Sequence, residues 1–231
     1  MIEYLIKHSG LIIMFFEFIA ALLGTLFFLK NKVSLFKSIA LFLWFTLIIE
    51  ILGKYTLYID DLSFLKLLKD TVFERNFWLY NFYGIFQVFF HLLVFLSIVK
   101  AKNSLRTLKF LLALFTIATA TILVINHEYY FVKYINDNFY AGSFTILVCV
   151  FVYFYEILNS DKILSFYKSF TFYYSVGLLV WWLVFPPLVI YYDYYTPYYP
   201  EFIKVKRIIL LLVNIFMYSC FIFGFVWHKE Q

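Results

Sequence analysis

Long apolar runs separated by short polar links dominate the chain. Runs such as 11–16 and 208–213 are apolar at every position, whereas the strands of a membrane β-barrel alternate apolar and polar residues. A helix needs about 20 apolar residues to cross a hydrocarbon core, because each residue rises about 1.5 Å. The pattern therefore predicts an all-α, polytopic bundle of seven transmembrane helices, at 10–29, 38–57, 77–99, 107–125, 139–158, 170–191 and 208–227.

The links between these segments predict the orientation. Lysine and arginine cluster in the first link (30–37) and the third link (100–109), and such clusters favour the cytoplasmic side of a membrane. We therefore expect the N-terminus outside and the C-terminus in the cytoplasm. The clustering carries this prediction, because the overall count of basic residues hardly differs between the two sides, 10 inside against 9 outside.

The second link, 58–75, is the longest. Asp60 or Asp61 is a suitable N-cap, and Leu62, Leu65, Leu68 and Val72 recur at helical spacing. We expect a short outer helix between the second and third spans, lying in the headgroup layer or as a lid on the bundle. Neither end nor any link has the pattern of a soluble domain, so we expect one transmembrane domain over 1–231.

Composition agrees with this picture and excludes several classes. Of the 231 residues, 65% are hydrophobic and 14% are charged, and the mean hydropathy is +0.87. So few charges could not cover a water-facing surface, which excludes a soluble enzyme. The net charge of +5 comes from the short links, where it suits anionic lipid headgroups better than nucleic acid. We expect a multi-pass protein of a cell membrane, the bacterial inner membrane, whose partners are the bilayer, a small ligand or ion, and a membrane protein.

A few polar side chains interrupt the apolar spans. Glu17, Glu50 and His91 are ionisable, and Gln87 and Asn214 are polar. An ionisable group at membrane depth costs about 2.5–3.5 kcal/mol on insertion scales, so each one needs a partner or a purpose.

The third span carries a polar stripe. Tyr80, Gly84, Gln87 and His91 are spaced four, three and four residues apart, with Asn81 beside them, which places them on one helix face. We expect Gly84 to let another helix approach closely. The stripe fits hydrogen bonding between helices, and it also fits a binding or conducting pocket.

The two glutamates differ in their surroundings along the chain. Lys54 follows Glu50 by four residues, where an ion pair on the same helix is geometrically available. Glu17 has no such neighbour, so we expect it to be protonated or held by a group on another helix. In the last span, Asn214 and Tyr218 lie four residues apart, and both side chains can hydrogen-bond across helices.

No pattern in the chain indicates catalysis, a metal or a cofactor. Motifs of zinc proteases and Ser-His-Asp hydrolases are absent, and Cys149 and Cys220 fall inside spans, as buried apolar residues would. Pro186 and Pro187 are expected to kink or end the sixth helix.

Three functions remain, and the order of preference follows from the polar residues. We favour a bundle that handles a small ligand, an ion or a proton in a polar cavity within the membrane. The candidate site residues are Glu17, Glu50, Tyr80, Asn81, Gln87, His91, Asn214 and Tyr218. The alternative is a non-transporting sensor, assembly factor or accessory subunit whose polar residues only set helix packing. A membrane-embedded enzyme acting on lipid is the third option.

Overall fold

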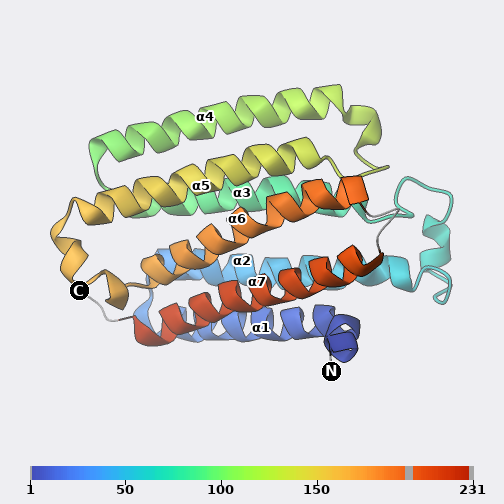
Figure 1. The fold of residues 1–231 in the computed structure, drawn as a ribbon, viewed down its shortest axis with the longest axis horizontal. Helices are drawn as coiled ribbons and strands as arrows, with labels where there is room; N and C mark the ends of the chain where they lie inside the picture. The colour runs from blue at the N-terminus through green and yellow to red at the C-terminus, as the bar shows by residue number, and fades with distance from the viewer. Residues whose placement is uncertain (1, 196–199, 229–231) are drawn as a thin grey trace. The chain divides into compact units, whose positions relative to one another are not determined.

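The computed structural model describes residues 2–195 and 200–228, and every regular element within them is helical. Figure 1 shows seven long helices joined by short links. Their bounds are α1 (Ile2–Asn31), α2 (Ser34–Gly53), α3 (Phe77–Ile98), α4 (Lys102–Ile125), α5 (Asn136–Leu158), α6 (Phe170–Tyr195) and α7 (Pro200–Trp227). Short 3-10 helices lie at η1 (Lys54–Leu57), η2 (Leu65–Leu68), η3 (His127–Tyr129), η4 (Asp161–Leu164) and η5 (Phe166–Lys168).

All seven helices are long and apolar enough to cross a membrane. The prediction of seven such segments in an all-α chain is confirmed. Several helices are longer than the apolar segments that predicted them: α1 begins at Ile2 rather than near residue 10, and α7 at Pro200 rather than near 208. Hydrophobicity marks the part of a helix that suits lipid, whereas backbone hydrogen bonding continues into the polar flank.

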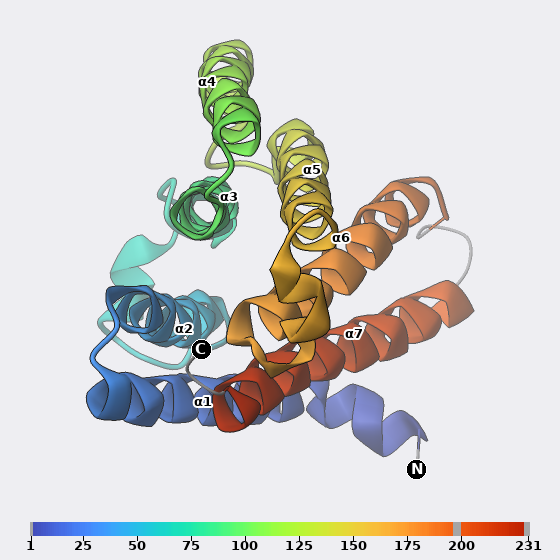
Figure 2. The same cartoon turned by 90° about the vertical axis from the view of Figure 1, so that its left-hand side faces the viewer.

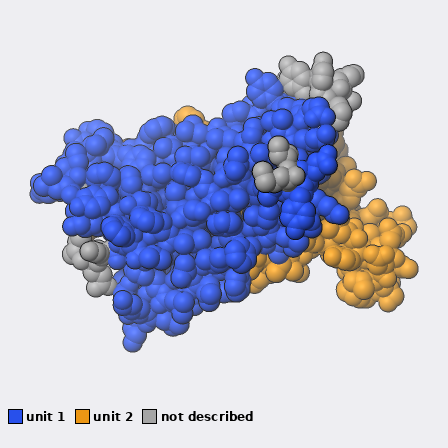
Figure 3. Space-filling view, turned by 60° about the horizontal axis from the view of Figure 1, so that its bottom comes forward, with its two compact units in different colours: residues 1–44, 146–231 blue, residues 45–145 orange. Residues whose placement is uncertain are grey.

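The chain forms two compact units. Unit 1 consists of residues 1–44 and 146–231, and unit 2 of residues 45–145 (Figure 3). The boundaries fall inside α2 and α5, so each of these helices contributes one part to each unit. The expectation of one domain over the whole chain stays a prediction.

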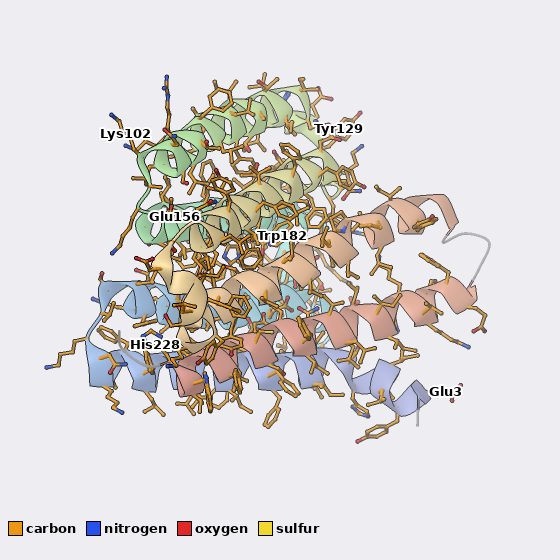
Figure 4. All side chains as sticks on the ribbon, turned by 60° about the vertical axis from the view of Figure 1, so that its left-hand side comes forward. Glu3, Lys102, Tyr129, Glu156, Trp182 and His228 are labelled. Atoms are coloured by element: carbon orange, nitrogen blue, oxygen red, sulfur yellow. The ribbon has the colours of Figure 1, made fainter. Side chains whose placement is uncertain are left out.

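Unit 1 is built around α7, which packs against α1 and α6 (Figures 1 and 2). Close to the end of α7, Phe225 is 2% exposed. Its ring stacks on Phe170 at 4.3 Å between centroids and lies beside Phe36 and Phe27. His228 completes this aromatic cluster, where its Nδ1 accepts a 3.2 Å hydrogen bond from the Phe170 backbone N–H (Figure 4).

Trp182 is the largest side chain buried in unit 1, and it is 1% exposed on α6 (Figure 4). Gly177, five residues earlier on the same helix, faces α7 so closely that a Cβ there would lie 3.2 Å from the Met217 carbonyl oxygen. Tight backbone contact at a glycine together with large aromatic rings gives α6 and α7 a dense interface.

Unit 2 contains α3, α4, the end of α2 and the start of α5. The α3 and α4 helices pack through Phe89 and Phe115, whose ring centroids are 5.0 Å apart. On another side of α3, Val88 fits against Gly142 of α5, where a Cβ would lie 2.5 Å from the Val88 Cγ2 atom. Figure 2 looks along these helices and shows α3, α4 and α5 beside one another.

The link between α2 and α3 does not form the amphipathic helix that its leucine spacing predicts. Its only regular element after Leu57 is the single 3-10 turn Leu65–Leu68. The Thr71 hydroxyl donates to the Leu68 carbonyl at 2.6 Å, and the Asp70 N–H donates to a Glu74 carboxylate oxygen at 3.1 Å. Side chains that capture nearby backbone groups compete with helix formation, so the expected helix stops after one turn.

An exposed ion pair joins the two ends of this link. Asp60 pairs with Lys69. The prediction that Asp60 or Asp61 caps a helix here is wrong, because Phe64 is the N-cap residue of η2 and no side chain caps it. The Lys69 ammonium holds the pKa of the Asp60 carboxyl below its usual value, first through their hydrogen bond and then through charge. The pair connects the turn at Asp60 to the end of η2.

Pro186 and Pro187 lie inside α6, and the helix continues past them to Tyr195. The prolines therefore do not end the sixth helix.

Candidate functional site

Glu17 is the only ionisable carboxyl among the fully buried side chains of the described chain. Its side chain is 0% exposed, as are those of Ala20 and Ala21 on the next turn of α1. Gly24 continues this face, and a Cβ there would lie 3.0 Å from the Phe225 ring. Small residues let α7 approach α1 closely, which places the Glu17 carboxyl inside unit 1 rather than on its surface.

The register of α1 and α7 places Tyr218 at the level of Glu17. Near the start of the two helices, Glu3 interacts electrostatically with Lys204, and near their ends Gly24 contacts Phe225. Both pairs are 201 positions apart in the chain, so the helices run parallel in one register. The residue 201 positions after Glu17 is Tyr218, which is 5% exposed. A carboxyl and a phenol therefore occupy the same level of the α1–α7 interface.

Asn214 lies one turn earlier on α7 and is held by its neighbours. Its Oδ1 atom accepts a 3.2 Å hydrogen bond from the Trp181 indole on α6. Its Nδ2 atom donates to the Leu210 carbonyl at 2.8 Å. The amide thus connects α6 to α7, as expected for a polar group that fixes helix packing.

In unit 2, the end of α2 packs against α3 through polar contacts. The Tyr83 hydroxyl donates to Thr46 Oγ1 at 2.9 Å. Two turns further along the same face of α2, the Tyr80 phenol occupies the space that a side chain at Gly53 would need. Glu50 lies between Thr46 and Gly53 on this face and is half-buried. Lys54 is close enough to interact with Glu50 electrostatically.

Asn81 has a structural role that its position in the stripe did not reveal. Its Nδ2 atom donates to the carbonyls of Tyr130 and Lys133 at 2.8 and 2.9 Å. Its Oδ1 atom accepts from the Ile135 N–H at 2.9 Å. The side chain is 8% exposed, and these three bonds use most of its hydrogen-bonding capacity. Asn81 therefore tethers the link between α4 and α5 to α3.

The other residues of the α3 stripe differ in burial. His91 is 4% exposed, whereas Gln87 is half-buried. The close helix approach that we expected at Gly84 is wrong, because a Cβ at this position would meet no described atom within 4 Å. The close approaches occur instead at Gly53 and Gly142.

The candidate residues thus fall into two groups. Glu17, Asn214 and Tyr218 belong to unit 1, and Glu50, Tyr80, Asn81, Gln87 and His91 belong to unit 2. Hydrogen bonds join Asn214 to α6 and Asn81 to the link between α4 and α5, and Tyr80 fills the space beside Gly53. A single polar cavity that includes both groups stays a prediction.

Among the buried polar residues of unit 2 that were not candidates, two make no hydrogen bond within the described chain. Asn138 is 7% exposed and Thr119 is 5% exposed. Neither the Asn138 amide nor the Thr119 hydroxyl makes a hydrogen bond within the described part of the chain. The fifth span was predicted to begin at residue 139, so Asn138 was assigned to a loop, whereas α5 begins at Asn136. Thr119 carried no signal, since threonines in helices usually bond their own backbone, as Thr116 and Thr121 do.

No cluster of three or more His, Cys, Asp or Glu side chains suited to a metal ion occurs among the described residues. Cys149 is buried, Cys220 is partly buried, and both are free thiols. In comparisons with protein-family models, curated proteins and solved structures, nothing matches the chain. The chemistry of its own residues therefore defines the class, a seven-helix protein with a buried carboxyl.

Proposed function

We propose that the chain is a multi-pass membrane protein that handles protons at Glu17, with its N-terminus outside and its C-terminus in the cytoplasm. The observation that carries this proposal is the complete burial of the Glu17 carboxyl in a helix apolar enough to cross a membrane. Such a group is costly in lipid, and ionisable residues inside membrane spans mark proton or ion pathways.

The chemistry around Glu17 favours a proton over a metal cation. Cations such as Ca²⁺ take six or more oxygen ligands, including several carboxylates. The described residues contain no cluster of acidic, histidine or cysteine side chains of that kind. A single buried carboxyl can instead take up and release one proton, and the buried Tyr218 phenol at its level is a hydrogen-bond donor.

The second candidate is a non-transporting membrane subunit. It is supported by Asn81 and Asn214, whose amides are bonded within the chain and hold helices and links together. Under this alternative, Glu17 would be one more polar packing group.

Proton flux in proteoliposomes separates the two functions. The purified protein is reconstituted into vesicles that contain a pH-sensitive dye, and an imposed pH gradient is followed with and without a potassium–valinomycin potential. We expect Glu17→Gln to reduce the flux to that of empty vesicles, because the amide keeps the shape of the side chain but cannot carry a proton. Tyr218→Phe should reduce the flux and leave part of it.

Glu201→Gln is the matched control, since Glu201 is an exposed carboxyl at the start of α7. It should leave the flux unchanged. A wild-type protein that conducts no more than empty vesicles, or a Glu17→Gln variant that conducts as well as wild type, would favour the non-transporting subunit.

A further inference from the structure

Two apolar contacts form a floor across α3, α4 and α5 in unit 2. Phe115 of α4 packs on Phe89 of α3 at 5.0 Å. Gly142 of α5 receives Val88 of α3, the residue beside Phe89 in the chain. Val88 is 0% exposed and Phe115 is 2% exposed, so both contacts are tight and lie at one level of the three helices.

One helical turn from this level, toward the start of α3, the character of the interface changes. The α5 helix runs parallel to α3, so the residue one turn from Gly142 is Asn138. The α4 helix runs antiparallel to both, so the residue one turn from Phe115 is Thr119 (Figure 1). Both side chains are more than nine-tenths buried, and their polar atoms make no hydrogen bond within the described chain.

The same level of α3 is unfilled beside Gly84. Gly84 lies one turn from Val88, and a Cβ at this position would meet no described atom within 4 Å. A further turn out, Asn81 holds the link between α4 and α5 across this end of the helices through three hydrogen bonds. The level is therefore bounded by an apolar floor and a tethered link.

We propose that Asn138 and Thr119 bind a small neutral molecule that both donates and accepts hydrogen bonds, in the space beside Gly84. Buried polar groups in proteins are nearly always satisfied, by protein or by a bound molecule. The Asn138 amide offers two donors and an acceptor, and the Thr119 hydroxyl offers both functions. Both side chains are neutral, and burying a charged ligand without a counter-charge would be costly. Water and a small amide or alcohol share this chemistry. The site uses no residue of the Glu17 proposal and does not depend on it.

Thermal unfolding of the full chain in lipid nanodiscs tests the site. Thr119→Val and Asn138→Leu remove the polar atoms and nearly keep the side-chain shape. If a bound molecule satisfies these groups, each variant loses its hydrogen bonds, and the midpoint should fall by about 2–4 °C. Thr121→Val is the matched control on α4, since the exposed Thr121 hydroxyl bonds the Ile117 carbonyl of its own helix. It should leave the midpoint almost unchanged.

A titration with acetamide distinguishes the sources of the bound molecule. A saturable rise of the wild-type midpoint that both variants lose identifies a site open to small solutes. A fall of the midpoint in both variants without any saturable acetamide effect identifies bound water. If Thr119→Val leaves the midpoint unchanged or raises it, the hydroxyl has no bound partner and the proposal is wrong, even if Asn138→Leu fails to fold.

Discussion

The two units bury their polar groups in different ways. Unit 1 buries one carboxyl, Glu17, on a face of α1 where Ala20 and Ala21 are also fully buried. Unit 2 buries amides and hydroxyls together with the His91 imidazole. Asn81 makes three hydrogen bonds, whereas Asn138 makes none within the described chain. A neutral group can serve structure or bind a neutral ligand, whereas a buried carboxyl changes charge when it gains or loses a proton.

Two asparagines of unit 2 differ in their hydrogen bonds although they are equally buried. Asn81 and Asn138 have the same side chain and nearly the same exposure, 8% and 7%. The first meets three backbone groups of a neighbouring link, and the second meets none within the described chain. Burial alone therefore does not distinguish a structural amide from a candidate binding group, and the hydrogen-bond partners do.

The largest effect is expected from the packing of unit 1. Phe225→Ala removes a ring that contacts Gly24, Phe27, Phe36 and Phe170. It should lower the free energy of unfolding by about 3–5 kcal/mol, the usual loss when a buried phenylalanine is replaced by alanine. Denaturant unfolding in mild detergent measures this. Phe216→Ala, a 42% exposed position on α7, is the control and should cost much less. Equal losses in the two variants would mean that the aromatic cluster does not hold unit 1 together.

The stability of unit 2 should depend on the hydrogen bonds that Asn81 makes to the link between α4 and α5. Asn81→Leu leaves the carbonyls of Tyr130 and Lys133 and the N–H of Ile135 without their partner. An unsatisfied buried group costs about 1–3 kcal/mol. Of the three partners only Ile135 is a buried residue, and water can reach the carbonyls of Tyr130 and Lys133 more easily. We therefore expect a loss of about 2–4 kcal/mol and faster amide hydrogen exchange in residues 126–135. Asn159→Leu is the control, because the exposed Asn159 amide bonds only its own helix. Unchanged exchange in this link would show that Asn81 does not hold it.

Two glycines of unit 2 have different surroundings, since the space beside Gly142 is filled and the space beside Gly84 is open. Gly142→Ala puts a methyl group 2.5 Å from the Val88 side chain and should cost about 1–3 kcal/mol through overpacking. Gly84→Ala meets no described atom and should change stability by less than about 0.5 kcal/mol or raise it, since alanine favours a helix over glycine. Thermal unfolding of both variants measures the difference. A Gly84→Ala variant as unstable as Gly142→Ala would contradict the open space beside α3.

The smallest effect concerns the exposed Asp60–Lys69 pair. Lys69→Met should raise the pKa of Asp60 toward its ordinary value of about 3.9, which an NMR titration of the carboxyl detects. Because the pKa of Asp60 is lowered in the folded chain, its contribution to stability is present above the ordinary pKa and is lost as the pH falls through the lowered one. Lys66→Met is the control, since Lys66 is the weakest cause of the shift. An unmoved pKa in Lys69→Met would mean that the pair does not form in solution.

The helices were predictable from the sequence because their apolar runs are long and continuous. The structure of the second link was not predictable in this way. Its leucine spacing favours a helix, but the Thr71 and Glu74 side chains bond backbone groups and oppose helix formation. A periodic pattern records which residues could share a face and does not record such local competition.

Part of the candidate site was predictable and part was not. The cost of a carboxyl in an apolar span identified Glu17 without any structure, and its burial follows from the small residues beside it. The roles of Asn81 and Asn138 depend on which segments meet them in space, and spacing along one helix contains no such information. Gly84 was misjudged for the same reason, since a glycine permits a close contact but does not require one.

The central claim is that Glu17 serves proton handling rather than packing, and the flux and the stability of Glu17→Gln measured on one preparation test it most directly. A group kept for function in spite of its cost should be replaceable without loss of stability. We predict that Glu17→Gln abolishes proton flux in proteoliposomes while its unfolding midpoint stays at or above that of wild type. Retained flux together with a lowered midpoint would contradict the claim and assign Glu17 to helix packing.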